Sequence, residues 1–174
     1  MAIPLLIFEF PQIKKNFQFN RFALIIGSLI PDILDKALMF LGISSGRSYS
    51  HTLLFSVVSS VLVFLIIKRS KAISISFFIG NLLHLLLDLP DIPLFFPFIS
   101  YDFIYIEDPF GFWFYKLLND PFTYISEIAG LVILIFVIVY NKLFSFKKIK
   151  VFLFKNSKKE LKIADKYDNK LTLE

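Results

Sequence analysis

This chain is built around the stretch Gly80-Asn81-Leu82-Leu83-His84-Leu85-Leu86-Leu87-Asp88-Leu89-Pro90, an apolar run that contains one histidine and one aspartate. Side chains at positions i and i+4 of an α-helix lie on one face, one turn apart, so His84 and Asp88 point the same way. Ionisable groups inside an apolar helix are costly unless they are paired or bind a cation. The stretch therefore predicts an apolar helix with a functional His/Asp pair, and a hydrogen-bonded structural pair is the alternative.

The composition around this stretch is typical of a membrane protein. The 174 residues are 56% hydrophobic and include 23 phenylalanines, the mean hydropathy is +0.70, and ordinary globular domains contain about 45–50% apolar residues. We expect an all-α, polytopic helical membrane protein with about four transmembrane helices of roughly 20 residues each, plus interfacial segments. The net charge of +5 does not indicate nucleic acid binding, because the basic residues lie mostly at the ends of apolar segments and in the C-terminal tail, where membrane topology explains them.

The apolar segments can be assigned in order along the chain. A proline disfavours helix, so Pro31 should break the first good hydrophobic segment beside Asp32 and Asp35. Ser50 or Thr52 is a suitable N-cap for the second segment. The expected elements are an interfacial or re-entrant piece at Met1–Phe10, spans at Phe22–Leu34, Thr52–Ile67, Ala72–Leu89 and Phe122–Tyr140, and an acidic, aromatic loop region at 91–121. Residues 1–146 would form the membrane domain with the site, and 147–174 a basic cytoplasmic tail.

The distribution of charge predicts the topology. Basic residues favour the cytoplasmic side, which places the short basic loop 68–71, the N-terminal basic cluster and the lysine-rich tail in the cytoplasm, with both termini. The acidic loop 91–121 then faces outward. Threading four spans under this rule brings the ends that carry Asp32, His51, His84 and Glu127 to one level at the outer side. The chain would be a multi-pass protein of the cell membrane.

The candidate ligands suit a divalent metal. The chain has no cysteine and only two histidines, so a metal would be held by imidazole and carboxylate groups, which are the usual zinc ligands when sulfur is absent. Such residues can form one metal site or a two-metal site with a bridging carboxylate. Each signal is weak alone, because a loop histidine, a turn aspartate, or a glutamate such as Glu127 paired with Arg47 can be purely structural. The candidate metal ligands are Asp32, Asp35, His51, His84 and Asp88.

Three short motifs occur in a family order: Gly27 to Asp35 (GSLIPDILD), Gly46 to Thr52 (GRSYSHT) and Gly80 to Asp88 (GNLLHLLLD). In this set the chain resembles the YdjM-like family of predicted inner-membrane, metal-dependent hydrolases. That family is distantly similar to the all-helical zinc-dependent phospholipase C and single-strand nuclease superfamily. The resemblance covers roughly residues 22–100.

The resemblance implies a set of residue roles. Asp32, His51, His84 and Asp88 would be metal ligands, and Asp35 would be a bridging ligand or general base. The chain departs from the pattern at four places. It has no counterpart to an N-terminal histidine common in relatives, P-D-I-L-D where P-D-x-D is usual, Gly46 where the family has histidine, and Thr123-x-x-x-Glu127 where the superfamily has H-x-x-x-E. These departures favour one or two metals over three.

The resulting expectation is a membrane-bound, metal-dependent hydrolase that uses a metal-activated water on a phosphoester or lipid-like substrate at the membrane boundary. Asp35 is the candidate general base, and Arg47 can hold an anionic headgroup or the developing charge. Membrane lipids and a lipid-linked substrate are the expected partners, and an oligomer is compatible with the sequence. The alternatives are a non-catalytic protein whose His/Asp cluster moves protons or cations, or a family member that retains the fold without activity.

Overall fold

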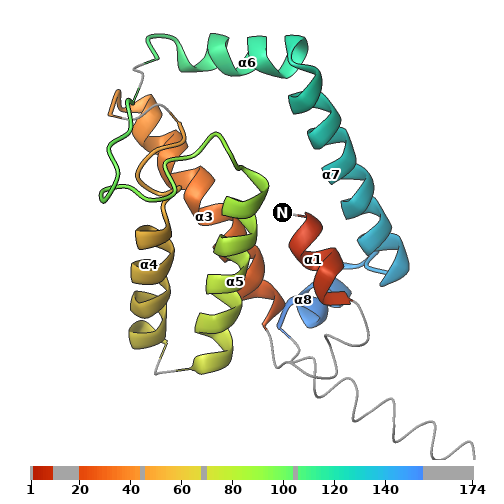
Figure 1. Ribbon diagram of the computed structural model, residues 1–174. Helices are drawn as coiled ribbons and strands as arrows, with labels where there is room; N and C mark the ends of the chain where they lie inside the picture. Colours follow the sequence, from red (N-terminus) through yellow and green to blue (C-terminus); the bar gives the residue numbers. More distant parts are fainter. Residues whose placement is uncertain (1, 10–19, 44–45, 68–69, 104–105, 155–174) are drawn as a thin grey trace, which may run out of the picture.

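A computed structural model describes residues 2–9, 20–43, 46–67, 70–103 and 106–154. Within these residues the chain forms helices and no strands, which confirms the predicted all-α class. Figure 1 shows α3, α4 and α5 side by side, α6 lying across one end, and α7 running along the opposite side of the molecule from α4. The helices are α1 (Ala2–Glu9), α3 (Arg21–Phe40), α4 (Leu53–Ile66), α5 (Lys71–Leu87), α6 (Pro109–Asn119), α7 (Pro121–Tyr140) and α8 (Phe146–Phe154).

Helix α3 is continuous, and the predicted break at Pro31 is wrong. The helix begins after Asn20, whose side chain accepts a hydrogen bond from the backbone N–H of Ala23 at 2.9 Å, and it runs through Pro31 to Phe40. A proline in a helix interior costs about 3 kcal/mol, and packing of α3 against α5, α1 and α8 along its length offsets that cost. Asp32 therefore lies on regular helix and not at a break.

Two glycines allow α3 and α5 to pack closely. A Cβ at Gly27 would collide with the backbone carbonyl oxygen of Phe77, and a Cβ at Gly80 would collide with that of Leu24. Small residues at facing positions let the backbones of two apolar helices approach, which is a common way of packing helices in membranes. This contact fixes the register of α5 against α3, one helical turn before the position of His84.

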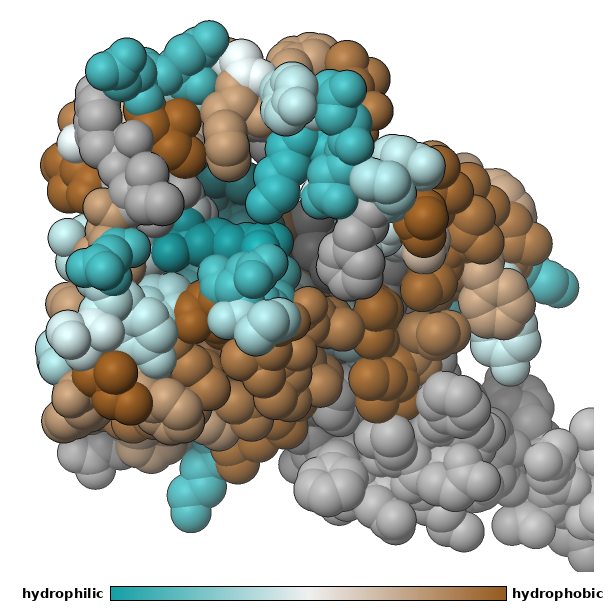
Figure 2. Space-filling model, turned by 45° about the horizontal axis from the view of Figure 1, so that its top comes forward, coloured by the Kyte–Doolittle hydropathy of each residue, from teal (hydrophilic) through white to brown (hydrophobic). Residues whose placement is uncertain are grey.

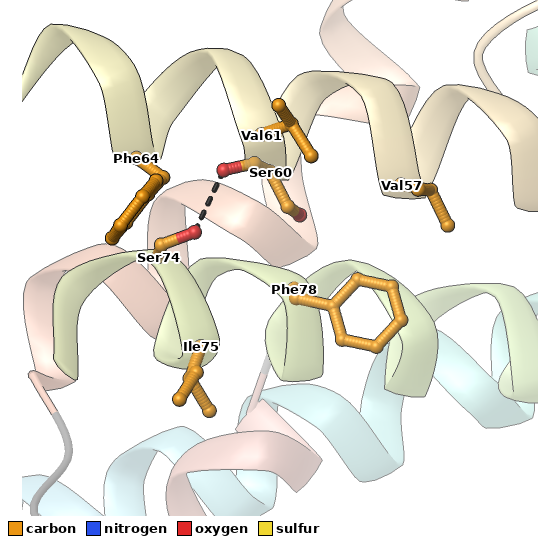
Figure 3. Close-up of a pocket in the computed structure, with 7 residues that line it drawn as sticks. All are labelled: Val57, Ser60, Val61, Phe64, Ser74, Ile75 and Phe78. Carbon is orange, nitrogen blue, oxygen red and sulfur yellow. Dashed lines mark hydrogen bonds between the residues drawn. The ribbon is translucent and has the colours of Figure 1, made fainter. Parts of the chain in front are cut away.

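Helices α4 and α5 contact each other through small polar side chains. The Ser56 hydroxyl donates to Oδ1 of the buried Asn81 at 2.8 Å, and the Ser74 hydroxyl donates to the backbone carbonyl of Ser60 at 2.7 Å, as Figure 3 shows. A shallow groove runs beside this contact and shares no residue with the His/Asp cluster described below. It is lined by Val57, Ser60, Val61, Phe64, Ser74, Ile75 and Phe78.

The predicted ends of α4 and α5 are correct to within two residues. Of the two suggested caps for α4, the N-cap is Thr52, whose hydroxyl accepts a hydrogen bond from the backbone N–H of Phe55 at 3.0 Å. The residue after α5, Asp88, is the C-cap, and Pro90 follows. The cap of α4 thus directly follows His51, and the cap of α5 is Asp88, which is itself a residue of the predicted site.

The region expected to be a loop, 91–121, contains helix α6. Its N-cap is Asp108, which accepts a hydrogen bond from the backbone N–H of Gly111 at 3.0 Å, and Pro109 occupies the first turn. Helix α7 then coincides with the predicted last span. Among the described residues, Thr123–Tyr140 is the only stretch of helix long and apolar enough to cross a membrane, whereas α4 and α5 are shorter apolar helices.

The two terminal helices pack against the longer ones. Helix α1 contacts α7 and α3, and α8 contacts α3. The guanidinium of the buried Arg21 donates from Nη1 to the backbone carbonyl of Phe152 at 3.1 Å. The same guanidinium lies 4.3 Å from the centre of the Phe152 ring. Residues 147–154, assigned above to the tail, are thus helical, with Phe152 buried against Arg21, and the rest of the predicted tail, 155–174, lies outside the described residues.

Candidate metal centre

Four of the predicted ligands converge from three parts of the chain. Asp32 lies on α3, His51 in the segment before α4, His84 in the last turn of α5, and Asp88 at the C-cap of that helix. One ligand atom from each lies within 4.8 Å of the others. Nε2 of His51 is 3.5 Å from Oδ1 of Asp32, 3.4 Å from Oδ2 of Asp88 and 3.2 Å from Nε2 of His84. Nε2 of His84 is 3.4 Å from Oδ2 of Asp88 and 3.8 Å from Oδ1 of Asp32.

These separations fit the coordination sphere of a small divalent metal. A tetrahedral zinc ion with ligand bonds of about 2.0–2.1 Å separates its ligand atoms by roughly 3.3–3.4 Å. Five of the six separations, 3.2 to 3.8 Å, lie around that value, and the sixth, between Asp32 and Asp88, is within 4.8 Å. Two imidazole nitrogens and two carboxylate oxygens are also a ligand set that zinc accepts. The four residues are therefore placed to hold a metal ion.

Asp35 does not belong to this group of four. Its side chain is fully buried, and Oδ2 lies 2.7 Å from Nδ1 of His51, across the ring from the nitrogen that faces the cluster. Its oxygens also accept hydrogen bonds from the backbone N–H groups of Ser48 at 2.6 Å and Ser50 at 3.1 Å, and from the Ser50 hydroxyl at 2.9 Å. The structure thus places Asp35 behind His51 and outside the group of four, whereas the sequence led us to expect a bridging ligand or general base. A carboxylate in this position is the common outer partner of a metal-binding histidine.

The electrostatics of His51 follow from these neighbours. His51 is fully buried in the segment between α3 and α4, and burial by itself disfavours the charged ring. Hydrogen bonds to Asp32, Asp35 and Asp88 outweigh that effect and raise the pKa of His51 to about 10. In the metal-free protein the imidazolium therefore supplies the positive charge that these carboxylates require.

Two cations lie beside the two clustered carboxylates, Asp32 and Asp88. Nη2 of Arg47 is 3.3 Å from Oδ1 of Asp88, and its Nη1 is 4.0 Å from the exposed Asp91. Nζ of Lys36 is 3.5 Å from Oδ2 of Asp32, one helical turn away. The sequence analysis missed Lys36, although an aspartate followed by a lysine at i+4 is the signal that predicts such a pair.

Aromatic packing holds the segment that carries His51. The ring of Tyr49 contacts Phe96 at a centroid distance of 5.8 Å and Phe103 at 5.3 Å. The backbone N–H of Leu53 donates to the carbonyl of Leu94 at 2.9 Å. The chain after α5 thus folds back over the start of α4 and fixes the segment from both sides.

The cluster is open on one side. His51 is completely buried and His84 is 11% exposed, whereas the Asp32 side chain keeps 35% of its surface exposed. Figure 2 views the end of the molecule where α3 and α5 end and α4 begins, and it shows hydrophilic residues gathered there above a hydrophobic surface. Asp32 is thus the most exposed of the four clustered residues.

Glu127 lies apart from the centre. It is exposed on α7 and is not among the four clustered residues. Arg47, its suggested partner, lies beside Asp88 and Asp91. Glu127 therefore has no place in the candidate metal centre.

One of the comparisons with known proteins agrees with the family resemblance noted above. Neither the curated proteins nor the solved structures include a significant match to this chain. The model of one family, described as YdjM inner membrane protein, matches residues 1–150. This match covers most of the chain and supports a location in the membrane, and the protein therefore belongs to the YdjM inner membrane protein family.

Proposed function

We propose that this protein is a membrane-bound, metal-dependent hydrolase that acts on a phosphoester or lipid-like substrate at the membrane boundary. The observation that carries the proposal is the convergence of Asp32, His51, His84 and Asp88, with ligand atoms at the spacing of a metal coordination sphere. Paired ionisable groups among apolar helices are otherwise costly, so their presence favours a site with a chemical role.

Zinc is the metal that we propose. The chain has no cysteine, and two neutral imidazoles with two carboxylates suit zinc better than magnesium or calcium, which prefer oxygen ligands alone. We propose that the site is catalytic and not a closed structural one, with the partly exposed Asp32, whose oxygen lies 3.8 Å from Nε2 of His84, giving up its position to water or substrate. Catalytic zinc sites keep a position for water or substrate.

The residues of the candidate centre have separate tasks in the proposed mechanism. When bound, the metal supplies a water of lowered pKa and polarises the phosphoryl oxygen. Asp35 accepts the proton on Nδ1 of His51 in a hydrogen bond, and thereby directs the lone pair of Nε2 into the site. In the overall reaction the water oxygen forms a bond to phosphorus, the bond to the leaving oxygen breaks, and a proton of the water ends on that oxygen. Because its oxygens are already engaged, we propose Asp35 as a positioning residue instead of the general base.

The proposed setting is a multi-pass membrane domain with α3, α4, α5 and α7 as spans and both termini in the cytoplasm. Helices α4 and α5, with 14 and 17 residues, have lengths of about 21 and 26 Å. They fall short of a hydrocarbon core of about 30 Å, so the bilayer would thin around them. Membrane lipids are then the nearest partners, and a lipid-linked phosphoester would reach the centre at headgroup depth.

The test is hydrolysis by purified full-length protein in detergent. The protein is stripped with a chelator, reloaded with zinc, manganese or magnesium, and assayed for phosphate release from phosphatidic acid in mixed micelles and for cleavage of chromogenic phosphomonoesters and phosphodiesters. We expect activity that depends on the added metal, is lost in His84→Ala and is retained in Glu127→Gln. Stoichiometric metal without hydrolysis of any of these substrates would contradict the proposal.

One observation favours a second candidate, movement of protons or cations. Nε2 of His51 and Nε2 of His84 lie 3.2 Å apart. Between α4 and α5 the Ser56 hydroxyl also donates to Oδ1 of Asn81. Nδ2 of this fully buried asparagine has no hydrogen-bond partner among the described residues. The serine hydroxyls donate to backbone carbonyls and to this amide, which argues for packing over a proton path. A pH-dependent flux into liposomes without bound metal would favour this candidate.

A further inference from the structure

Each carboxylate ligand of the centre divides its two oxygens in the same way. Asp32 turns Oδ1 toward the two histidines and Oδ2 toward Lys36, at 3.5 Å. Asp88 turns Oδ2 toward the histidines and Oδ1 toward Arg47, at 3.3 Å. The two cations are therefore each one carboxylate away from the same metal position, on the outer side of different ligands.

Both cations are available to a ligand. The Lys36 side chain is 49% exposed and that of Arg47 is 42% exposed. Ion pairs of this exposure contribute little to stability, so either cation can exchange its partner at little cost. An arginine and a lysine are also the residues that bind phosphoryl oxygens most often, the first with a planar fork and the second as a point charge.

The charges around a loaded centre are close to balance. A divalent cation with Lys36 and Arg47 carries four positive charges, against the four carboxylates of Asp32, Asp35, Asp88 and Asp91, the last of which is 73% exposed and 4.0 Å from Arg47. An incoming phosphoryl group therefore meets two half-exposed cations with no surplus of negative charge around them.

We propose that Lys36 and Arg47 form a two-part phosphoryl-binding site at the mouth of the metal centre, and that this site selects anionic phosphoesters over neutral esters. The inference rests on the proposed function and deepens it by assigning the substrate class. Lys36 and Arg47 turn from Asp32 and Asp88 toward two oxygens of the phosphoryl group when the substrate binds. They are binding residues, and the four ligands keep their places.

The experiment measures binding of inorganic phosphate to the zinc-loaded, full-length protein in detergent by titration calorimetry, with zinc content determined on the same samples. Charge-assisted hydrogen bonds contribute about 1.5–3 kcal/mol, so Lys36→Gln and Arg47→Gln should each weaken phosphate binding by at least about tenfold. Lys36→Arg, which keeps the charge, should restore most of the affinity. The matched control is Lys116→Gln on α6, an exposed lysine outside the centre, which should bind phosphate as the wild type does.

Short-chain phosphatidic acid, added as a competitor, distinguishes a lipid headgroup from free phosphate. If phosphatidic acid displaces phosphate at a concentration far below the dissociation constant of phosphate, the natural ligand is a lipid headgroup. If it displaces phosphate only at a concentration similar to that constant, the natural ligand is free phosphate. A zinc-loaded protein that binds neither ligand overturns the inference and leaves the proposed hydrolase standing. Variants that lose zinc together with phosphate overturn it too, because the cations would then support the ligands. A wild type that binds no metal overturns the proposed function itself.

Discussion

Oδ2 of Asp35 lies 2.7 Å from Nδ1 of His51, on the opposite side of the imidazole from the nitrogen that faces His84. This contact orients a buried ring at the centre of the site. It also explains why a carboxylate with no exposure is tolerated there, because backbone N–H groups and a hydroxyl satisfy its oxygens. The candidate metal centre thus has an outer layer formed by Asp35 on α3 and by the backbone of Ser48 and Ser50 before α4.

Replacement of Asp35 tests this outer layer. Asp35→Asn should weaken zinc binding about 10- to 100-fold, because the partner that orients His51 is weakened. Ser50→Ala removes only one hydroxyl donor to Asp35 and should have a smaller effect. Zinc affinity measured by competition with a chromogenic chelator checks both, and unfolding in detergent reports whether the variants fold. Unchanged affinity in Asp35→Asn would refute the positioning role.

The pH dependence follows from His51. Because the pKa of His51 in the metal-free protein is about 10, zinc must displace a proton from the ring over most of the accessible range. Apparent zinc affinity should therefore rise as pH increases, by up to about tenfold per unit for one proton. Titrations between pH 6 and 9 test this, and an affinity independent of pH would count against a ligand role for His51.

The same pKa predicts a stability change in the metal-free protein. A histidine with a raised pKa stabilises the fold fully below its unfolded value of 6.5, and that contribution is lost as pH rises toward 10. Thermal unfolding of the chelator-treated protein should therefore fall to lower temperatures across this window. The zinc-loaded protein is the control, since its ring carries no proton on Nε2 to lose. An equal fall of the unfolding temperature in the chelator-treated and zinc-loaded proteins would indicate a titrating group other than His51.

The glycine contacts between α3 and α5 make a further prediction. Gly27→Ala and Gly80→Ala each force a methyl group against a backbone carbonyl and should destabilise the protein by about 1–3 kcal/mol or more. Gly130→Ala on α7 is the matched control, because a Cβ there would meet nothing within 4 Å. The control should be neutral or slightly stabilising, since alanine favours helix over glycine by about 1 kcal/mol. An equal free energy of unfolding for all three variants would contradict the close approach of α3 and α5.

Helix α8 should depend on the Arg21 contact. Phe152→Ala removes the buried ring beneath the guanidinium and should increase hydrogen exchange in α8. Phe146→Ala, on the same helix but 85% exposed, should leave exchange there as in the wild type. The comparison is made by hydrogen–deuterium exchange in detergent, and similar protection in both variants would show that this contact does not hold the helix.

Much of the helical pattern was accessible from the sequence. Long apolar runs bounded by Thr52, Pro90 and the basic loop predicted α4 and α5 closely, because caps and breakers act locally. Helix α6 was missed although Asp108-Pro109 is an N-cap followed by proline at the first helical position. The opposite error occurred at Pro31, where contacts between helices outweigh a local preference against helix.

The centre was only partly predictable for the same reason. The spacing of His84 and Asp88 and the shared level of helix ends indicated which residues could meet, and the structure brings these two together with Asp32 and His51. The direction in which Asp35 points could not be read from its spacing, because it depends on the backbone of Ser48 and Ser50. Four spans, the orientation in the membrane and the chemistry of hydrolysis stay predictions.

The most direct measurement is the metal content of gently purified, full-length protein by elemental analysis, with wild type, His84→Ala and Glu127→Gln prepared in parallel without chelator. We predict about one zinc ion per chain in the wild type and in Glu127→Gln, and little or none in His84→Ala. Absence of metal from the wild type, or equal metal in all three proteins, would contradict a metal centre formed by Asp32, His51, His84 and Asp88.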